Sequence, residues 1–395
     1  MSILSTKKII LGVSTSVSLY KSLDLIRVLR KQNIEVHVVL TENASKMISK
    51  NLFEVLSNNF VHIDGQIDYS KLSHIELARK ADAIIICPAT ANIIGKIANG
   101  IADTFLTTLV LAANCPKLIC PAMNSQMWLN SIVQENVEKL KRHGFKFVEP
   151  KEGILACGIQ GVGKLASINE IMFNLEKLFI KQDLKGKDVL ITTGATIEKI
   201  DPVRFISNFS SGKMGKSLAL EALKRGARVK LICGENVEIE ELKDLDFGIV
   251  KVQSALEMKD AVLKNIGNCD YFISAAAVSD FKPKRFENNK IKKKDILNLE
   301  LEKNVDILES IKNMKFKKKP MIVGFALETE DLKKNALLKL KEKNLDLIIA
   351  NSIENLGSEE KEVVILDGKR EVRIGRSARG DVARLIWDKV ITNFL

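Results

Sequence analysis

The sequence of 395 residues has few of the features that build metal centres or membrane spans. Its four histidines and six cysteines include no Cys-x-x-Cys pair, so no structural zinc site is predicted. No apolar run approaches the roughly 18 residues that indicate a transmembrane helix. The opening Met-Ser-Ile-Leu-Ser-Thr lacks the basic region and the cleavage site of a secretory signal. We therefore expect a cytoplasmic protein with no membrane partner.

Motifs of several common functional classes are also missing. The chain has no zinc finger, no aromatic RNP motif and no heptad repeat, so we expect no nucleic-acid partner. Gly-x-Ser-x-Gly is absent, which leaves serine-hydrolase chemistry without support. Residues 210–217 resemble a P-loop, but the motif needs glycine at position 210 and the chain has Ser210.

The formal net charge of +12 is concentrated in two lysine-rich segments. Residues 281–295 carry seven basic and two acidic side chains, and residues 312–319 carry five lysines and no acid. Such segments suit nucleic acid, a polyanionic small molecule such as a triphosphate, or simply a solvated surface. A nucleic-acid-binding protein would show strong, salt-sensitive binding to DNA or RNA.

Short apolar segments alternate with helical patterns along both halves of the chain. In the first half we expect strands at 8–13, 35–40, 83–87, 117–120 and 145–148, and a helix at 18–31. After a polar stretch at 181–188 that predicts a linker, we expect strands at 189–193, 229–233, 271–275, 321–325 and 345–350, and a helix at 211–225. This alternation predicts the α/β class, with two doubly wound, Rossmann-like domains at 1–183 and 184–395.

Polar turns follow three of the expected strands in the first half. They are Gly12-Val-Ser-Thr-Ser-Val-Ser18, Cys87-Pro-Ala-Thr-Ala-Asn92 and Cys120-Pro-Ala-Met-Asn-Ser-Gln-Met-Trp128. Ligands of open α/β sheets bind at the carboxyl ends of the strands, and free N–H groups at helix N-termini bind phosphate. One such turn alone is explained by a helix N-cap, but three turns that converge on one sheet edge predict a ligand site.

The string Pro-Ala-Met-Asn-x-x-Met-Trp at 121–128 resembles the signature of flavin-binding phosphopantothenoylcysteine decarboxylases. The Ser73-His74 turn and the glycine-rich loop at 156–163 occur at that family's spacing. The resemblance covers residues 1 to about 180. It implies a flavodoxin-like flavoprotein of the homo-oligomeric, flavin-containing Cys decarboxylase type, with FMN as cofactor. The residues that it implies around FMN are Gly12, Ser14, Thr41, Pro88, Thr90 and Asn92.

The resemblance also implies catalytic roles. FMN would oxidise the thiol end of the substrate, so that the carbanion left by CO₂ loss delocalises onto sulfur. His74 would be the base of this oxidation, since an imidazole titrates near the working pH. Asn124 would hold the substrate carboxylate, and Cys157 would donate the proton of the final reduction. Ile159 and Lys164 depart from the Asp and Arg that the family usually has in this loop.

The second half contains strings that resemble phosphopantothenate–cysteine ligases. They are the segment at 201–215, Ala275-Ala-Ala-Val-Ser-Asp280, Lys290-Ile-Lys-Lys293, Val323-Gly-Phe-Ala326 and Lys343-Asn-Leu-Asp346. The resemblance implies that the carboxylate of 4′-phosphopantothenate attacks the α-phosphate of CTP and that pyrophosphate leaves. The amine of cysteine then displaces CMP from the acyl-cytidylate. In tandem, the two halves resemble the bifunctional bacterial enzymes that make 4′-phosphopantetheine for coenzyme A.

Charge grows on the α-phosphate during this reaction, so fixed cations and a divalent metal favour it. The resemblance implies that Lys290 stabilises this charge, that Asn208 holds the acyl intermediate, and that Mg²⁺ arrives with CTP. The implied nucleotide-binding residues are Ser274, Ala275, Ala276, Asp280, Lys290, Val305, Asp306, Ile307, Leu308, Phe325, Lys339 and Lys343. The segment at 312–319 keeps its interpretation as a solvated surface. Departures from the family pattern are Ala195, Ile197, Val305 and Ser352.

The resemblance implies homo-oligomers, with trimers of the flavoprotein half and dimers of the ligase half. One alternative stays open, a non-catalytic flavin-binding scaffold with a regulatory role, because relatives of this flavoprotein fold act in that way. The presence of His74, Asn124 and Cys157 argues for the enzyme.

Overall fold

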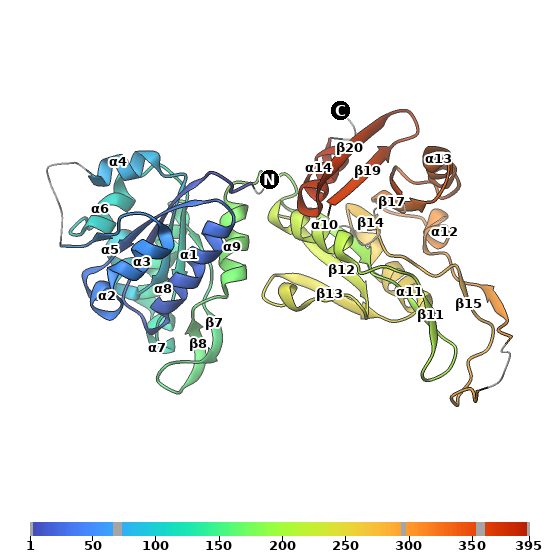
Figure 1. Ribbon diagram of the computed structural model, residues 1–395, viewed down its shortest axis with the longest axis horizontal. Helices are drawn as coiled ribbons and strands as arrows, with labels where there is room; N and C mark the ends of the chain where they lie inside the picture. Colours follow the sequence, from blue (N-terminus) through green and yellow to red (C-terminus); the bar gives the residue numbers. More distant parts are fainter. Residues whose placement is uncertain (1–2, 66–72, 294–297, 353–359, 393–395) are drawn as a thin grey trace. The chain divides into compact units, whose positions relative to one another are not determined.

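The computed structural model describes residues 3–65, 73–293, 298–352 and 360–392. The chain divides into two compact units, Met1–Ile180 and Lys181–Leu395 (Figure 1). Each unit has its own apolar core around a largely parallel sheet, so the predicted α/β class is confirmed in both halves. None of the helices in the described ranges combines the length and the apolar character needed to cross a bilayer.

Unit 1 is built on a six-stranded parallel sheet of order β3-β2-β1-β4-β5-β6. The strands are β1 (Lys8–Val13), β2 (Glu35–Leu40), β3 (His62–Ile63), β4 (Ala83–Ala89), β5 (Lys117–Pro121) and β6 (Lys146–Phe147). They are apolar runs because helices cover both faces. The strand order reverses between β1 and β4, which is where an open sheet of this topology binds ligands.

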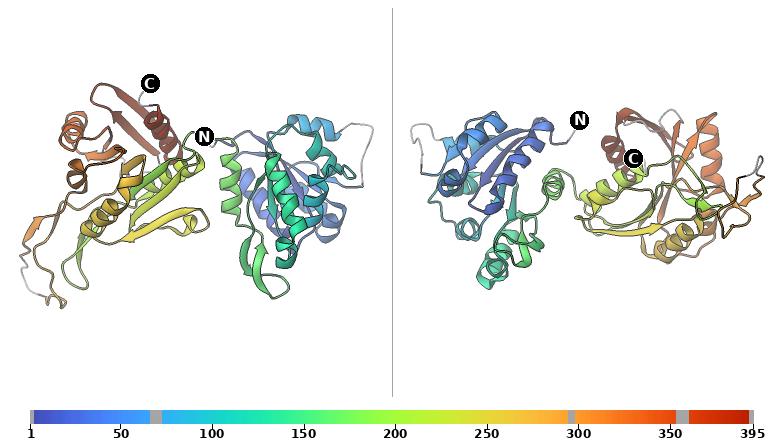
Figure 2. Two further views of the ribbon diagram at one scale, coloured as in Figure 1. Left: turned by 180° about the vertical axis from the view of Figure 1, so that it is seen from behind. Right: turned by 60° about the horizontal axis from the view of Figure 1, so that its bottom comes forward.

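Helices pack on both faces of the unit 1 sheet (Figure 2). One core cluster takes its helical residues from η1, α1, α2, α3 and α9, and the other takes them from α4, α5, α6, α7 and α8. The expected helix at 18–31 is split into a 3-10 turn, η1 (Val17–Tyr20), and α1 (Lys21–Lys31). The remaining helices are α2 (Glu42–Met47), α3 (Lys50–Ser57), α4 (Ser73–Lys80), α5 (Ala91–Ala98), α6 (Phe105–Ala112), α7 (Ser125–Leu129), α8 (Ser131–Arg142) and α9 (Ile168–Lys177).

A hairpin of β7 (Lys151–Ile154) and β8 (Gln160–Lys164) projects from unit 1 outside the main sheet. No strand was predicted here, because the hairpin is glycine-rich and most of its residues are partly or fully exposed. It carries the loop with Cys157.

Unit 2 is built on an eight-stranded sheet of order β13-β12-β9-β14-β17-β18-β19-β20. The strands are β9 (Asp188–Thr193), β12 (Arg228–Gly234), β13 (Phe247–Val252), β14 (Tyr271–Ser274), β17 (Met321–Glu328), β18 (Leu347–Ser352), β19 (Glu360–Leu366) and β20 (Glu371–Ala378). The strands from β13 to β18 are parallel, whereas β19 and β20 pair antiparallel. The sequence did not predict this antiparallel pair, so the sheet is mixed rather than purely parallel.

Helices also cover both faces of the unit 2 sheet. The core cluster that contains Leu190 takes its helical residues from α11 (Ala255–Asn265), α12 (Ile307–Lys312) and α13 (Leu332–Glu342). On the other face α10 (Lys213–Lys224) packs against α14 (Arg379–Ile391). Short 3-10 turns are η3 (Glu240–Leu242) and η4 (Ile266–Asn268).

Two short hairpins form an arm beside the unit 2 sheet. β10 (Ile197–Lys199) pairs with β11 (Phe205–Ser207), and β15 (Phe281–Pro283) pairs with β16 (Leu301–Lys303), both antiparallel. β10 and β15 contact each other, and the arm extends to one side of the sheet in Figure 1.

The polar stretch at 181–188 is docked on unit 2 and is not a free linker. Leu184 is fully buried, and its N–H donates to the carbonyl oxygen of Arg225 at 3.1 Å. The Gln182 amide donates to the carbonyl oxygen of Lys224 at 2.8 Å. The Arg225 guanidinium, whose side chain is 5% exposed, pairs with Asp183, Glu221 and Asp388. This buried network ties the start of unit 2 to α10 and α14.

Arg225→Ala should destabilise unit 2 by about 3–5 kcal/mol, because it leaves the buried Glu221 and the largely buried Asp183 carboxylates without their cation. The measurement is the free energy of unfolding in urea. Arg228→Ala is the matched control, since the Arg228–Asp188 pair is exposed on both sides and its loss should barely move the midpoint. Equal effects of the two substitutions would contradict a structural role for the buried network.

Candidate active sites

Ser14 joins the first two polar turns of unit 1 at the point where the strand order reverses. It is 2% exposed, although it lies in a turn. Its hydroxyl donates to the carbonyl oxygen of Pro88 at 2.8 Å and accepts from the N–H of Thr90 at 3.0 Å. The end of β1 and the end of β4 are therefore held together.

Hydroxyl groups line the same edge of the sheet. Thr90 caps α5 and Thr41 caps α2, each through its side-chain oxygen. The Thr41 and Thr15 hydroxyls lie 3.4 Å apart. Asn92 is exposed in the first turn of α5. Hydroxyls beside helix N-termini form a donor set that fits a phosphate and a polyol chain.

Gly12 has a packing role as well as its predicted place beside a ligand. A Cβ atom at this position would lie 2.7 Å from Cδ1 of Leu106 in α6. The absence of a side chain at position 12 thus lets α6 approach β1 closely.

Two glycines seat the β7–β8 hairpin on the third polar turn. A Cβ on Gly163 would lie 2.1 Å from the carbonyl oxygen of Met123, and a Cβ on Gly161 would lie 2.3 Å from the hydroxyl oxygen of Ser125. The N–H of Met123 donates to the carbonyl oxygen of Gly163 at 3.1 Å. Any larger residue would push the hairpin off the turn.

This seat brings Asn124 and Cys157 together, although they are far apart in the sequence. The Asn124 oxygen caps α7 by accepting from the N–H of Gln126, and its amide nitrogen lies 3.6 Å from Sγ of Cys157. Of the six cysteines, all within the described ranges, Cys157 is the one that is exposed. Burial raises the pKa of the Cys269 thiol to about 12, which is the contrasting case of an inert buried cysteine.

His74 lies in the first turn of α4, and its ring meets Phe105 edge-on at 6.2 Å. Phe105 also stacks on His62, whose pKa is lowered by burial. Figures 1 and 2 show α4 and the β7–β8 hairpin at opposite ends of unit 1. A single chain therefore does not bring His74 to Asn124 and Cys157.

Unit 2 contains a cavity of about 1660 Å³ at the carboxyl ends of β9, β14 and β17. Asn208 lines it, and so do the implied nucleotide-binding residues apart from Lys290. These lining residues are Ser274, Ala275, Ala276, Asp280, Val305, Asp306, Ile307, Leu308, Phe325, Lys339 and Lys343. Residues from several separate sequence segments thus meet at one edge of the sheet.

Two lysines of α13 and its end supply positive charge to this cavity. The Lys339 ammonium donates to the carbonyl oxygen of Phe325 at 2.9 Å, and burial lowers the pKa of Lys339. Lys343 pairs with Asp306 at 2.8 Å and Glu309 at 3.1 Å, and these hydrogen bonds, led by Asp306, raise the pKa of Lys343. Asp306 in turn caps α12.

The N-terminus of α10 opens into the same cavity. Gly212 precedes the helix with φ of +70°, and no side chain caps the first N–H groups. The Thr193 hydroxyl fixes this turn by donating to the carbonyl oxygen of Gly212 at 2.7 Å. Residues 210–217 therefore present a helix N-terminus to an anion without the P-loop motif. Asn208 donates to the carbonyl oxygen of Ala277 at 3.2 Å nearby.

Lys290 does not line the cavity. It is exposed in the segment between β15 and β16. Sequence reasoning also missed Asn236 and Arg379, which do line it. Arg379 begins α14 directly after the unexpected strand β20, so no local signal marked it.

The departure at Val305 has a local explanation. Its N–H donates to the side-chain oxygen of Asn304 at 2.9 Å, a hydrogen bond that proline would lack. Within the described ranges, no group of three or more His, Cys, Asp and Glu side chains is arranged to hold a metal ion.

Comparison with known proteins gives matches along the whole chain. A family model described as "DNA/pantothenate metabolism flavoprotein C-terminal domain" matches residues 184–394, and one described as "Flavoprotein" matches residues 2–179. The coenzyme A biosynthesis bifunctional protein CoaBC of Bacillus subtilis is 44% identical over 361 residues, which cover 90% of this chain and 88% of the relative. The protein of that name from Borreliella burgdorferi is 39% identical and covers 96% of this chain and 98% of the relative.

Solved structures also match. The crystal structure of the C-terminal domain of a coenzyme A biosynthesis bifunctional protein CoaBC is 35% identical, with a TM-score of 0.45. The match covers 54% of this chain and 98% of that domain.

The close contacts of Gly161 and Gly163 with the third polar turn predict that an engineered disulfide can link positions 124 and 157. With Asn124→Cys, the engineered thiol should form a disulfide with Cys157 under mild oxidation, since their side chains already meet. Adding Gly163→Ala should slow this reaction roughly tenfold or more, because bridged Cβ atoms must lie about 3.8 Å apart. The yield is read by mass spectrometry of peptides.

Gly153→Ala is the control within the same hairpin. A Cβ at position 153 would meet only the flexible Lys164 side chain, 3.2 Å from its Cδ. If the disulfide forms equally fast in Gly163→Ala and Gly153→Ala, the close contact at Gly163 does not position Cys157.

Proposed function

Because the chain belongs to the family of bifunctional coenzyme A biosynthesis proteins, we propose that its two units catalyse consecutive steps of one synthesis. The enzyme is both a phosphopantothenate–cysteine ligase and a phosphopantothenoylcysteine decarboxylase. We assign the ligase to unit 2 and the decarboxylase to unit 1, which correspond to the domains predicted at 184–395 and 1–183. The unit 2 cavity carries this assignment, since it gathers the nucleotide-binding residues that the sequence implied.

In unit 2, CTP would bind with its phosphates between the N-terminus of α10 and the lysines of α13. The open N–H groups of the helix and the Lys339 and Lys343 ammonium groups supply the positive charge. The carboxylate of 4′-phosphopantothenate attacks the α-phosphate and pyrophosphate leaves. Mg²⁺ would enter with CTP on the triphosphate oxygens, since substrate phosphates commonly supply part of its coordination.

Asn208 and Lys290 serve the second half of this reaction. Asn208 lines the cavity and holds the acyl-cytidylate while the amine of cysteine displaces CMP. Lys290 stabilises the negative charge on the phosphate during transfer. Since Lys290 lies outside the cavity of its own chain, the arm as a whole would carry it to that cavity or to the cavity of a second subunit.

In unit 1, the hydroxyls of Thr41 and Thr90 fit the phosphate and ribityl chain of FMN. Ser14, whose hydroxyl donates to the carbonyl oxygen of Pro88, holds the turn that carries Thr90 beside this site. FMN, when bound, supplies the two-electron oxidation and reduction that decarboxylation requires. Asn124 holds the substrate carboxylate through its amide nitrogen. Cys157 lies beside that nitrogen and donates the final proton. His74 takes the proton from the substrate thiol.

The separation of α4 from the β7–β8 hairpin favours a decarboxylase site that two subunits share. We propose that His74 of one subunit faces Asn124 and Cys157 of the next in a homotrimer.

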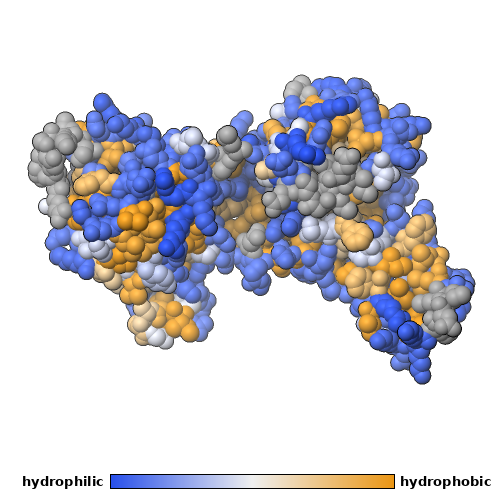
Figure 3. Space-filling model, in the orientation of Figure 1, coloured by the Kyte–Doolittle hydropathy of each residue, from blue (hydrophilic) through white to orange (hydrophobic). Residues whose placement is uncertain are grey.

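Apolar side chains gather on the arm of unit 2 (Figure 3), where Val203, Phe205, Phe281 and Phe286 are each more than half exposed. Such a patch fits a dimer of ligase units. We place the enzyme in the cytoplasm, where its substrate CTP is made.

Lys290→Gln should lower ligation roughly 10²–10³-fold, as expected when one preorganised group that stabilises a transition state is lost. Lys318→Gln is the matched control. Lys318 lies in the other lysine-rich segment, is 73% exposed and pairs with Asp270. Ligation is followed by release of CMP, with decarboxylation of supplied phosphopantothenoylcysteine as the internal reference. Equally small effects at both lysines would mean that the segment at 281–295 is only a solvated surface.

The shared site predicts complementation between inactive variants. His74→Asn alone should block substrate oxidation, and Cys157→Ser alone should stall before the final reduction. Co-expressed in equal amounts, the two should regain about a quarter of the parent's decarboxylation rate, the share of mixed sites that combine both intact residues. No regained activity, with mixed trimers verified by native mass spectrometry, would place His74 and Cys157 of one chain in the same site.

A further inference from the structure

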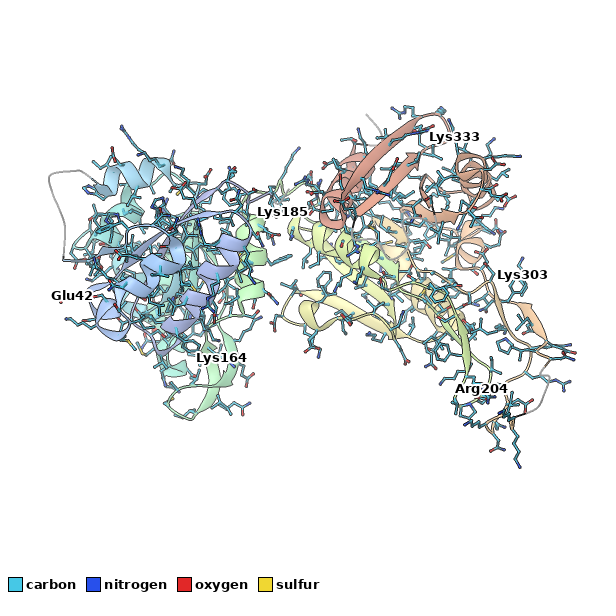
Figure 4. The ribbon with its side chains drawn as sticks, in the orientation of Figure 1. Glu42, Lys164, Lys185, Arg204, Lys303 and Lys333 are labelled. Carbon is cyan, nitrogen blue, oxygen red and sulfur yellow. The ribbon has the colours of Figure 1, made fainter. Side chains whose placement is uncertain are left out.

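The two hairpins of the unit 2 arm are joined at their tips. The loop at 200–204 links β10 to β11, and the segment at 284–300 links β15 to β16. The N–H of Glu287 in this segment donates to the carbonyl oxygen of Ile200 at 2.9 Å. Figure 4 shows Arg204 on this part of the arm, away from the sheet.

The centre of this junction is the carboxylate of Asp201. Although it lies in a loop, Asp201 is 1% exposed. Its Oδ1 accepts from the N–H groups of Val203 and Arg204, both at 2.8 Å. Its Oδ2 accepts from the Arg204 guanidinium at 3.2 Å and from the N–H of Ile291 at 3.1 Å.

Arg204 completes the contact from the other side. Its Nη2 donates to the carbonyl oxygen of Ile291 at 3.2 Å. Asp201 and Arg204 thus hold both backbone groups of Ile291, the residue that follows Lys290. Because the contact is to the backbone, it leaves the neighbouring lysine side chains available. Within the described ranges, Lys290, Lys292 and Lys293 have no carboxylate partner within 4.0 Å.

We propose that Asp201 and Arg204 are positioning residues for Lys290, which they fix by gripping the backbone of Ile291. The proposal rests on the role assigned to Lys290 above. It gives a physical reason why the segment at 201–215 and the lysines at 290–293, distant in sequence, act together. The structure joins them through hydrogen bonds between the Asp201–Arg204 pair and the backbone of Ile291.

The physical benefit is preorganisation of a flexible cation. A lysine on an unanchored segment would have to be ordered anew in each transition state, at an entropic cost. A fixed backbone at position 291 removes part of that cost before the substrate arrives. The acceptor sites of Asp201 are filled by Arg204 and three backbone N–H groups, so the carboxylate does not compete with the nucleotide for the Lys290 ammonium.

The test compares Asp201→Asn with Glu287→Gln in the full-length enzyme. Both changes remove one negative charge from the arm, but only Asp201→Asn alters a side chain that binds the backbone of Ile291. Tryptic cleavage after Lys290, Lys292 and Lys293 under native conditions should be roughly tenfold faster or more in Asp201→Asn, because cleavage follows the open population of the segment. In Glu287→Gln it should match the parent.

Ligation kinetics supply the second readout. Asp201→Asn should lower kcat roughly tenfold to a hundredfold while KM for CTP stays within about twofold, since Lys290 acts on the transition state. Combined with Lys290→Gln, it should add little further loss, because the two changes remove the same interaction. Arg204→Lys keeps the positive charge but loses the two-pronged guanidinium group, so it should also increase the rate of tryptic cleavage. This variant serves as the test if Asp201→Asn does not fold.

Unchanged cleavage in Asp201→Asn and Arg204→Lys would overturn the proposal, and so would fully additive losses in the double variant. The activity of Lys290→Gln tests the role of Lys290 separately from the contact at Ile291. If Lys290→Gln alone ligates normally, the role of Lys290 fails, while the cleavage rates still report whether the grip on Ile291 exists.

Discussion

A parallel sheet that is wound outward in both directions from its first strand must leave a crevice where its two halves diverge. Both units of this enzyme obey that constraint, between β1 and β4 in one and between β9 and β14 in the other. Backbone N–H groups of helix N-termini collect at this edge without any sequence motif. α5 begins at this edge in unit 1 and α10 begins at it in unit 2, so both edges present N–H groups that favour an anion.

A crevice alone binds a ligand but supplies little chemistry. Two of the residues to which we assign chemical roles, Cys157 and Lys290, lie on hairpins outside the sheets, whereas His74 lies on α4. The β7–β8 hairpin carries Cys157 to Asn124, held by glycines that allow backbone contact. The arm carries Lys290, held by a carboxylate and a guanidinium that grip a neighbouring backbone. In both cases the contact depends on particular neighbours, which are glycines in the hairpin and the Asp201 and Arg204 side chains in the arm. The side chains of Cys157 and Lys290 are themselves exposed.

The sequence predicted the parallel core best, because buried strands are continuous apolar runs. The strands at 8–13 and 35–40 have the predicted bounds. It missed the β19–β20 pair, since the apolar run at 363–366 in β19 is short and most residues of β20 are partly or fully exposed. It mistook 181–188 for a linker, because a polar segment can be held by hydrogen bonds as well as by water. The grouping of the implied nucleotide-binding residues was predicted from the family resemblance. Their spacing in the sequence does not show which of them are in contact. The separation of α4 from the β7–β8 hairpin could not be predicted from the sequence. The motifs with His74 and Cys157 occur in the same chain whether they act in one site or in sites of different subunits.

The central claim is that one chain performs both steps, each in its own unit. The most direct measurement is to incubate the purified enzyme with 4′-phosphopantothenate, ¹³C-carboxyl-labelled cysteine, CTP and Mg²⁺, and to follow products by mass spectrometry. The account predicts CMP and pyrophosphate, transient phosphopantothenoylcysteine, and then unlabelled 4′-phosphopantetheine with release of labelled CO₂. Accumulation of phosphopantothenoylcysteine without labelled CO₂, from enzyme loaded with FMN, would contradict the account and leave unit 1 as a flavin-binding scaffold.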